Sequence, residues 1–356
     1  MGLISWLKKG ASEAPQPAGP EEEPESVSEL AEALSSSNGA ARVDAARALL
    51  DRWRGGDAAA AEALVARLAD LLEDAEPQVR IAGLTSVRML RKLENVEAHA
   101  SAALSLLADP VAQVRTAAVW TAARLPGEAA RTQVRALLAS TEEPMRFAAA
   151  CALSDQHDAA AIPVLTAALR EEVRKQEALS AIMSLGDPAA LPEVSALFEE
   201  ESLGDFDRTL AAAALARLGD ARGGAHLAER VAVDGDDRPI AAEWAGRLGV
   251  AEAVPALQEL AESEGDPARG AALRALGRLG ATGAEDRLFA LATSPEQPED
   301  LRMDAAEGLA EVGSPRAVET LQSLAREAGE LGPLCRELLA ELAMNRAEST
   351  SNPTST

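Results

Sequence analysis

Side chains that commonly perform catalysis or bind metals are few in this sequence of 356 residues. The titratable candidates are three histidines and two cysteines, namely His99, His157, His226, Cys151 and Cys335. Acid–base catalysis and metal binding both need several such groups converging in one site. Only one histidine has an ionisable neighbour, and this pair, His157 and Asp158, lies in a predicted turn where Asp is typical of a helix N-cap. We therefore expect no enzymatic activity, no metal site and no cofactor.

Acidic residues dominate the charged side chains. The sequence has 58 Asp and Glu against 34 Lys and Arg, which gives a formal net charge of −24. Binding to phosphate backbones requires a basic surface, so nucleic acid is excluded as a partner. A protein partner, attracted in particular through a basic surface, is favoured instead. Only four of the basic residues are lysines, a bias that we interpret as typical of a bacterial genome rich in G and C.

Basic residues also recur at regular intervals along the chain, each close to the start of a predicted helix. This structural ladder is Arg42, Arg80, Arg115, Arg146, Lys175, Arg208, Arg238, Arg269 and Arg302. Acidic residues precede most of its members, as Asp109 precedes Arg115. Carboxylates in such positions cap helices and pair with neighbouring cations. We therefore interpret the ladder as caps and ion pairs between repeats.

Further acidic residues lie at equivalent positions and exceed what helix capping requires. They define a predicted acidic edge: Glu171, Glu172, Glu199, Glu200, Glu201, Asp234, Asp236 and Asp237. Such an edge could steer a basic partner towards the protein. The alternative is a solvated face that keeps the protein soluble.

The ladder belongs to a repeated block with the pattern R-x-x-A-A-x-A-L-x-x-L-G-D. Nine copies begin 29 to 38 residues apart, and a partial tenth surrounds Arg336. After each copy comes a turn and a second apolar stripe, often with proline in its first turn, as at Pro163 and Pro255. Hydrophobic residues reach 47% but aromatic residues only 2%, so alanine and leucine must fill the core. The pattern predicts an all-α, right-handed α-solenoid of about nine to ten helical hairpins.

The clearest copy, RTLAAAALARLGD from Arg208, and its counterparts resemble the HEAT-repeat family over residues 40–342. Within it they are similar to the short bacterial form found in phycobilin-lyase-type proteins. The resemblance implies a superhelical protein-binding scaffold or adaptor, and it transfers no catalytic residue. We expect the second helices to form the concave face. Arginines on these helices that fall outside the apolar stripe are predicted partner contacts: Arg131, Arg135 and Arg230.

Two other functions remain open as alternatives. A lyase that attaches a chromophore or prosthetic group would share the repeat type, but the sequence has no Tyr and only four Phe and four Trp to hold a flat ligand. Di-iron hydroxylases built on similar repeats use His-Glu dyads, and no His here is followed by Glu. The second alternative is a regulator that acts at a membrane surface.

The ends of the chain differ from the repeats. Residues 1–10 predict a short amphipathic docking tag, with Leu3, Ile4, Trp6 and Leu7 on one side and Lys8 and Lys9 on the other. The tag could enter a partner's groove, which we favour, or settle on a membrane or on the solenoid itself. Its apolar residues precede its basic ones, the reverse of a secretory signal, so we expect a cytoplasmic protein. Residues 11–39 predict a disordered acidic linker rich in proline, and residues 343–356 a disordered polar tail.

Overall fold

The computed structural model describes residues 26–351, apart from residue 94, with side chains described as far as residue 343. The chain divides into two compact units, unit 1 (Met1–Asp187) and unit 2 (Pro188–Thr356). Within the described residues every regular element is an α-helix or a short 3₁₀-helix. No helix there is long and apolar enough to cross a membrane. The predicted all-α solenoid is therefore confirmed as a fold class.

Each ladder residue lies in a helix that we call a first helix. Those of unit 1 are α3 (Gly39–Arg54), α6 (Pro77–Leu90), α8 (Ala112–Ala122), α10 (Glu143–Ser154) and α12 (Lys175–Leu185). Second helices follow them in the chain: α4 (Ala58–Val65) with α5 (Leu68–Leu72), then α7 (Ala100–Ser105), α9 (Glu128–Ala136) and α11 (Ile162–Ala168). Short 3₁₀ turns, η1 (Glu97–His99), η2 (Leu106–Ala108), η3 (Leu137–Ala139) and η4 (Ala159–Ala161), begin or extend the second helices.

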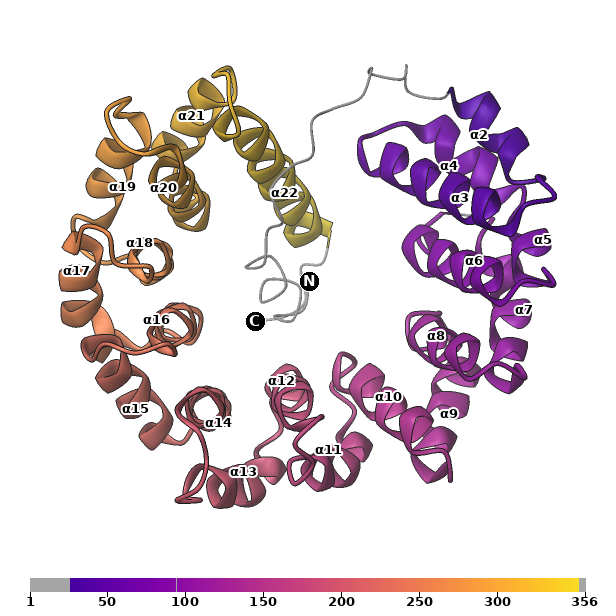
Figure 1. The fold of residues 1–356 in the computed structure, drawn as a ribbon, viewed down its shortest axis with the longest axis horizontal. Helices are drawn as coiled ribbons and strands as arrows, with labels where there is room; N and C mark the ends of the chain where they lie inside the picture. The colour runs from indigo at the N-terminus through magenta and orange to yellow at the C-terminus, as the bar shows by residue number, and fades with distance from the viewer. Residues whose placement is uncertain (1–25, 94, 352–356) are drawn as a thin grey trace. The chain divides into compact units, whose positions relative to one another are not determined.

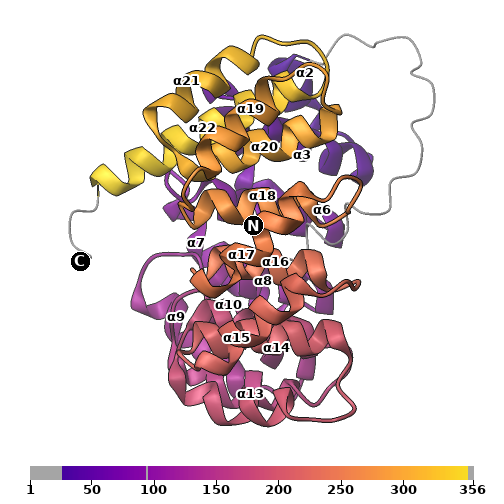
Figure 2. The ribbon, with the colours of Figure 1, turned by 90° about the vertical axis from the view of Figure 1, so that its left-hand side faces the viewer.

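Unit 2 repeats the arrangement. Its first helices are α14 (Asp205–Arg217), α16 (Arg238–Arg247), α18 (Arg269–Arg278), α20 (Glu299–Val312) and α22 (Leu331–Ser351). Its second helices are α13 (Leu191–Phe198), α15 (Ala221–Ala232), α17 (Val254–Glu262), α19 (Ala284–Thr293) and α21 (Pro315–Leu324), and the 3₁₀ turns are η5 (Pro188–Ala190) and η6 (Ala251–Ala253). Figure 2 shows the helices of unit 2 in successive layers from α13 to α22.

Within each unit the helices form two rows. Every first helix packs against the next first helix, α3 on α6 and α14 on α16 for example. Figure 1 shows that each unit curves with its first helices on the inner side, while second helices such as α9 and α15 lie on the outer side. The concave face of each unit is therefore made by the first helices, and the prediction that the second helices make it is wrong.

Small residues explain the direction of this curvature. A Cβ atom on Gly246 of α16 would lie 2.6 Å from Ala275 Cα of α18, and one on Gly277 would lie 2.6 Å from the carbonyl oxygen of Gly308 on α20. First helices of unit 2 thus approach each other backbone to backbone. A row of closely spaced helices must be shorter than the row behind it, so it takes the inner side of the bend. Both helices of a hairpin carry an apolar stripe, which is why the stripe alone did not reveal this.

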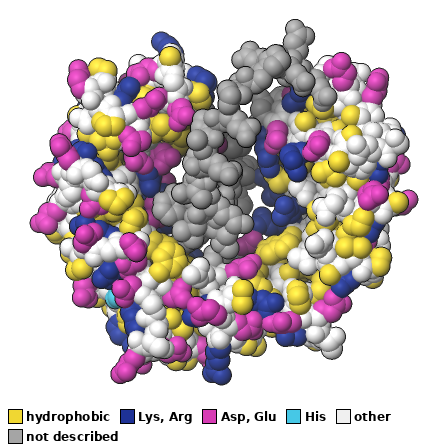
Figure 3. All heavy atoms as spheres, viewed as in Figure 1, with side chains coloured by type: hydrophobic (Ala, Val, Ile, Leu, Met, Phe, Trp, Pro, Cys, Tyr) yellow, Lys and Arg dark blue, Asp and Glu magenta, His cyan; other side chains and the backbone are white. Residues whose placement is uncertain are grey.

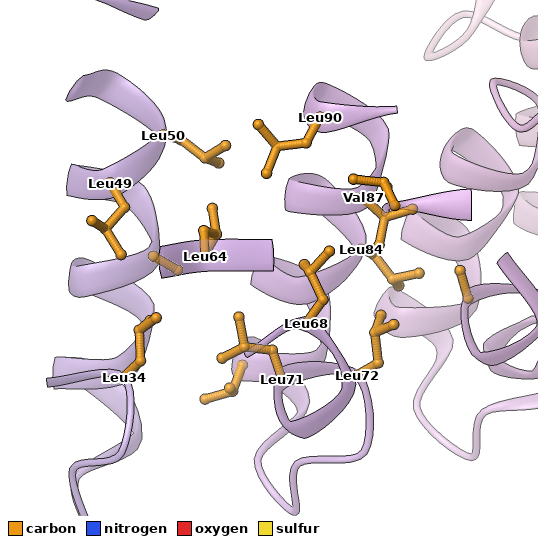
Figure 4. Packing of buried hydrophobic residues seen from close by; sticks show 14 of the residues in the cluster. Leu34, Leu49, Leu50, Leu64, Leu68, Leu71, Leu72, Leu84, Val87 and Leu90 are labelled. Carbon is orange, nitrogen blue, oxygen red and sulfur yellow. The ribbon is translucent and has the colours of Figure 1, made fainter. Parts of the chain in front are cut away.

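Leucine and alanine side chains fill the space between the two rows. In unit 1, Leu49 of α3, Leu64 of α4 and Leu84 of α6 are fully buried. Figure 4 shows these side chains pointing into a common layer between the helices. The core therefore continues from repeat to repeat, as expected of a stacked array.

The predicted disordered linker at residues 11–39 is wrong for residues 27–33. Residues 27–33 form helix α2 (Val27–Ala33), which packs on α3 and α4. Ser26 and Glu29 form a reciprocal capping box, in which the Ser26 N–H donates to Glu29 Oε2 over 2.7 Å. Leu30 and Leu34, one helical turn apart, are buried. The acidic composition concealed this cap and this apolar pair. The predicted tag and residues 11–25 lie outside the described residues.

The predicted disordered tail at residues 343–356 also begins too early. Helix α22 continues to Ser351. The sequence has no glycine or proline between Leu334 and Asn352 that would end it, and the next proline is Pro353. Polar composition alone therefore did not locate the end of the helix.

Candidate protein-binding surface

The concave face of unit 2 carries a group of charged side chains among helices otherwise rich in alanine. This charged network comprises Glu243 and Arg247 of α16, Arg274 and Arg278 of α18, and Asp304, Glu307 and Glu311 of α20. Its members lie on three successive first helices of the inner row, and its links run from each helix to the next. The network is thus a continuous feature of this face.

Glu243 is the centre of the network. Its Oε1 atom accepts from Arg247 and from Arg278, each over 2.7 Å, and Arg274 lies 3.8 Å from Oε2. Burial tends to raise the pKa of this carboxyl, but the three guanidinium groups outweigh burial and lower its pKa. Glu243 therefore stays ionised although it is only 8% exposed.

For two carboxyl groups of α20, burial outweighs the attraction of the neighbouring arginine and their pKa values are raised. Arg274 pairs with Asp304 and, over 3.2 Å, with Glu307, while Arg278 reaches Glu311 over 2.8 Å. Burial raises the pKa of Asp304 and of Glu307, and the attraction of Arg274 only partly offsets this. Each of the two arginines thus joins Glu243 to acids of the next helix.

An aromatic side chain adjoins the network. Trp244 follows Glu243 on α16 and is 9% exposed. The guanidinium carbon of Arg247 lies 5.6 Å from the centre of its ring, a cation–π distance. The indole N–H is buried and has no hydrogen-bond partner among the described residues. Tryptophan and arginine are the residue types enriched at the energetic centres of protein interfaces.

The concave face of unit 1 carries arginines instead. We call Arg54, Arg88, Arg91 and Arg124 the arginine patch; they lie at the carboxyl ends of α3, α6 and α8. Figure 3 shows Lys and Arg side chains gathered on the inner side of unit 1, beside α6 and α8. Burial lowers the pKa of Arg88, and repulsion by the other three arginines lowers it further. The patch is therefore a concentration of positive charge in a strongly acidic protein.

The predicted concave contacts lie on the opposite row. Arg131 and Arg135 belong to α9 and Arg230 to α15, which are second helices on the outer side of their units. Arg135 pairs with Asp158 over 2.5 Å, and Arg131 lies 4.0 Å from Glu128. These residues do not face the concave surface, because the row of second helices, which was predicted to lie inside, is the outer one.

The predicted acidic edge is divided between paired and open carboxylates. Glu171 and Glu172 of unit 1 pair with Arg174 and Lys175, each over 2.8 Å. In unit 2, Glu199 pairs with Arg222 over 2.6 Å. The remaining exposed members are Glu200, Glu201, Asp234 and Asp236.

One predicted edge residue is not at an edge. Asp237 is only 2% exposed and accepts from Thr209 Oγ1 over 2.6 Å and from Arg230 Nε over 2.8 Å. Burial would raise the pKa of Asp237, but these two donors lower it. The structure thus brings together Arg230 and Asp237, which were predicted to lie on two different surfaces.

The structural ladder makes local and inter-repeat contacts. Arg42 pairs with Asp74, Arg80 with Asp109, Arg115 with Glu142, Arg238 with Asp266 and Arg302 with Glu327. Lys175 pairs with Glu172 of the turn before its own helix. Arg146, Arg208 and Arg269 donate to the main-chain oxygens of Ser140, Phe198 and Ala261. The acids that pair with Arg42, Arg80, Arg115, Arg238 and Arg302 lie 25 to 32 residues after them, which places these acids in the following repeat.

The residues of the concave face were missed, although the sequence carries a signal for them. The sixth position of the repeated block is Ala213 in the copy from Arg208 but Glu243, Arg274 and Glu307 in the next three copies. Since alanine is accepted at this position of the repeat, a charged residue there is not needed for packing. These positions form a surface only because the first helices make the inner row. The curvature of the array decides which row is inner, and the sequence does not reveal it.

Comparison with known proteins agrees with this architecture. Residues 100–185 and 254–332 match the family model for HEAT repeats. Each unit thus contains a stretch that matches HEAT repeats. No curated protein matches the sequence.

Three solved structures show similarity to this chain. The chain is 21% identical to human deoxyhypusine hydroxylase in complex with glycerol, over 70% of this chain and 97% of that chain, with a TM-score of 0.30. It is 19% identical to the complex of CpcE and CpcF of phycocyanin lyase from Nostoc, over 94% and 99% of the two chains, with a TM-score of 0.38. It is 13% identical to importin beta, over 91% of this chain and 53% of that one, with a TM-score of 0.48. No activity is carried over from these structures.

Proposed function

We propose that this chain is a non-enzymatic, cytoplasmic scaffold that binds a protein through the concave face formed by its first helices. The observation that carries the proposal is the charged network of unit 2. Ion pairs that are partly withdrawn from water contribute little net stability, because desolvation offsets their attraction. The inner row of helices packs mainly through alanine and glycine. Its seven charged side chains are therefore better explained by recognition of a partner than by folding.

The chemistry of the network indicates the kind of surface that would fit it. Four carboxylates and three guanidinium groups lie together with Trp244 and the stacked Arg247. A partner would place both charges against this face, beside the guanidinium of Arg247 that lies over the Trp244 ring. The net charge of −24 favours encounter with a partner of opposite overall charge. We therefore expect a basic protein partner whose association slows as ionic strength rises.

Site-specific photocrosslinking tests the proposal. We expect Glu311→p-benzoylphenylalanine, on α20 of the inner row, to crosslink a partner in cells severalfold more efficiently than Glu319→p-benzoylphenylalanine. Glu319 lies on α21 of the outer row, and both glutamates are exposed, so the two variants lose the same residue type. Mass spectrometry of the crosslinked band identifies the partner.

The crosslinking result has a clear counter-outcome. Equal crosslinking from positions 311 and 319, or crosslinking from position 319 only, would show that the concave face is not the binding surface. Adding Arg274→Ala to the Glu311 variant should reduce the crosslink, because Arg274 holds Asp304 and Glu307 in the network. An unchanged crosslink in that double variant would mean that the partner binds the concave face without using the charged network.

A further inference from the structure

The arginine patch on the concave face of unit 1 contains more positive charge than the surrounding side chains neutralise. Arg54 pairs with Asp51 of its own helix over 2.9 Å, and Arg124 pairs with Asp155 at the end of α10 over 2.6 Å. The other two members of the patch have no carboxylate within ion-pair distance in the part of the chain that the structure describes. The patch therefore has two positive charges that no described side chain balances.

These two members, Arg88 and Arg91, lie one helical turn apart at the carboxyl end of α6. Both residues are partly buried. Arg91 donates to the carbonyl oxygen of Arg88 over 3.1 Å, so its guanidinium lies against the last turn of the helix. Burial and the repulsion of the other three arginines lower the pKa of Arg88. Two positive charges are thus held close together where water solvates them incompletely.

Helix stability accounts for only part of this arrangement. Cations at the carboxyl end of a helix interact favourably with its dipole. That attraction is small at the surface, and salt screens it. It also does not require that one guanidinium be partly buried close to three others. An anion bound at Arg88 and Arg91 would offset both the desolvation and the repulsion.

The spacing of the two unneutralised arginines indicates the chemistry of that anion. Side chains three residues apart on a helix are neighbours, so one small group can accept from both. A carboxylate brings a single charge and two oxygens in one plane. A phosphate monoester carries a charge of about −1.5 to −2 at pH 7 and three acceptor oxygens. It therefore matches two guanidinium groups, each of which can donate two parallel hydrogen bonds.

The surroundings of the patch indicate a phosphate on a protein and not a longer polyanion. Trp120 lies one turn before Arg124, and it is partly buried. It occupies the sixth position of the repeated block, the position that Glu243 has in the charged network. Tryptophan and arginine together are typical of protein interfaces. A nucleic acid has a charge on every nucleotide, and a chain with a net charge of −24 would repel it outside the patch.

We propose that the arginine patch binds a phosphorylated side chain of a partner protein. Arg88 and Arg91 hold the phosphate, while Arg54 and Arg124 raise the positive potential around it. Clusters of arginine are a general means of recognising phosphorylated segments. Binding by unit 1 then depends on whether the partner is phosphorylated. This role goes beyond the one proposed for the charged network, which lies on unit 2 and fits a basic surface.

Peptide libraries test the proposal on the full-length chain. The probe is a library of short peptides with phosphoserine at the central position and mixed residues around it. We expect the immobilised protein to retain about fivefold more of this library than of a matched library with central glutamate, because two guanidinium groups donate to one dianion. Exchange of Arg88 and Arg91 for glutamine (R88Q/R91Q) should reduce retention of the phosphoserine library to that of the glutamate library. Mass spectrometry of the eluted peptides measures both.

Matched variants separate the patch from net charge and from folding. The variant R67Q/R170Q removes two arginines from elsewhere in unit 1, before α5 and after α11, and should retain the phosphoserine library as the parent does. R88K/R91K keeps both charges but loses the planar donor pairs, so it should retain an intermediate amount. Circular dichroism should show the same helix content and melting temperature for R88Q/R91Q as for the parent.

Three results would overturn the proposal. Equal retention of the phosphoserine and glutamate libraries would mean that the patch does not select phosphate. Equal retention of the phosphoserine library by the parent and by R88Q/R91Q would place binding elsewhere. Stronger retention of single-stranded oligothymidine, lost in R88Q/R91Q, would assign the patch to nucleic acid. The libraries contain no natural partner and the variants lie in unit 1, so the outcome is independent of the crosslinking test on α20 and α21.

Discussion

Gly223→Ala is expected to lower the free energy of unfolding by about 3 kcal/mol, the upper end of the range for overpacking a core. A Cβ atom on Gly223 of α15 would lie well inside 3.0 Å of Ala212 O and Ala216 N on α14. Both of these are main-chain atoms, so no side chain can rotate to make room. Helices α14 and α15 would have to separate, and the layer between the two rows of unit 2 would open. Urea unfolding followed by circular dichroism measures the loss.

The neighbouring glycine is the control for this prediction. A Cβ atom on Gly224 would meet only the Val250 methyl groups, at 3.7 and 3.8 Å, which is ordinary packing distance. Gly224→Ala should therefore leave stability unchanged or raise it by about 0.5–1 kcal/mol, since alanine favours the helix. If Gly223→Ala proves as stable as Gly224→Ala, then α14 and α15 do not approach as closely as the structure has them.

The contrast between these two glycines shows what the sequence can and cannot reveal. The repeated block and its spacing were enough to predict helical hairpins stacked in an array. Nothing in the sequence distinguishes Gly223, which allows two helices to meet, from Gly224, which does not. Close approach is a property of two segments together, and periodicity within one segment reports only which side is buried.

The concave face was misplaced for a related reason. Both rows of helices carry apolar stripes, so the stripes predict two layers without saying which layer is shorter. The backbone contacts of Gly246 and Gly277 decide it, and they involve α16, α18 and α20 together. Once the inner row is known, the charged column through Glu243 and Arg274 becomes a surface. Without knowledge of the inner row, the arginines of α9 and α15 are equally plausible as contacts on the concave face.

Asp109→Ala is expected to lower the free energy of unfolding by about 3 kcal/mol, the lower end of the range for removing one partner of a buried ion pair. Asp109 is 6% exposed. It accepts from Arg80 Nε and from the N–H of Val111, each over 2.8 Å. Its loss would remove the acceptor for the Val111 N–H in the turn before α8 and leave the guanidinium of Arg80 uncompensated. Arg80 retains the main-chain oxygens of Asp74 and Ala75 as acceptors, which limits the loss.

The effect of Asp109→Ala should depend on pH in a defined direction. Burial would raise the pKa of Asp109, but the hydrogen bonds from Arg80 and Val111 and the charges of Arg80 and Arg115 lower it. A carboxyl whose pKa is lowered by folding stabilises the folded state above its unfolded pKa of about 3.9. That stabilisation is lost as the pH falls through the lower folded pKa. The difference between Asp109→Ala and the parent protein should therefore be constant near pH 7 and shrink below about pH 4.

The equivalent acid of the next repeat provides the comparison. Glu142 pairs with Arg115 as Asp109 pairs with Arg80, but its side chain is 51% exposed. Glu142→Ala should therefore cost less than about 1 kcal/mol, because water already screens the half-exposed carboxylate and Arg115 keeps the main-chain oxygens of Asp109 and Pro110 as acceptors. Equal losses from Asp109→Ala and Glu142→Ala would mean that burial does not distinguish the two pairs. A larger loss from Asp109→Ala alone would assign the stabilising role to the buried pair between α6 and the turn before α8.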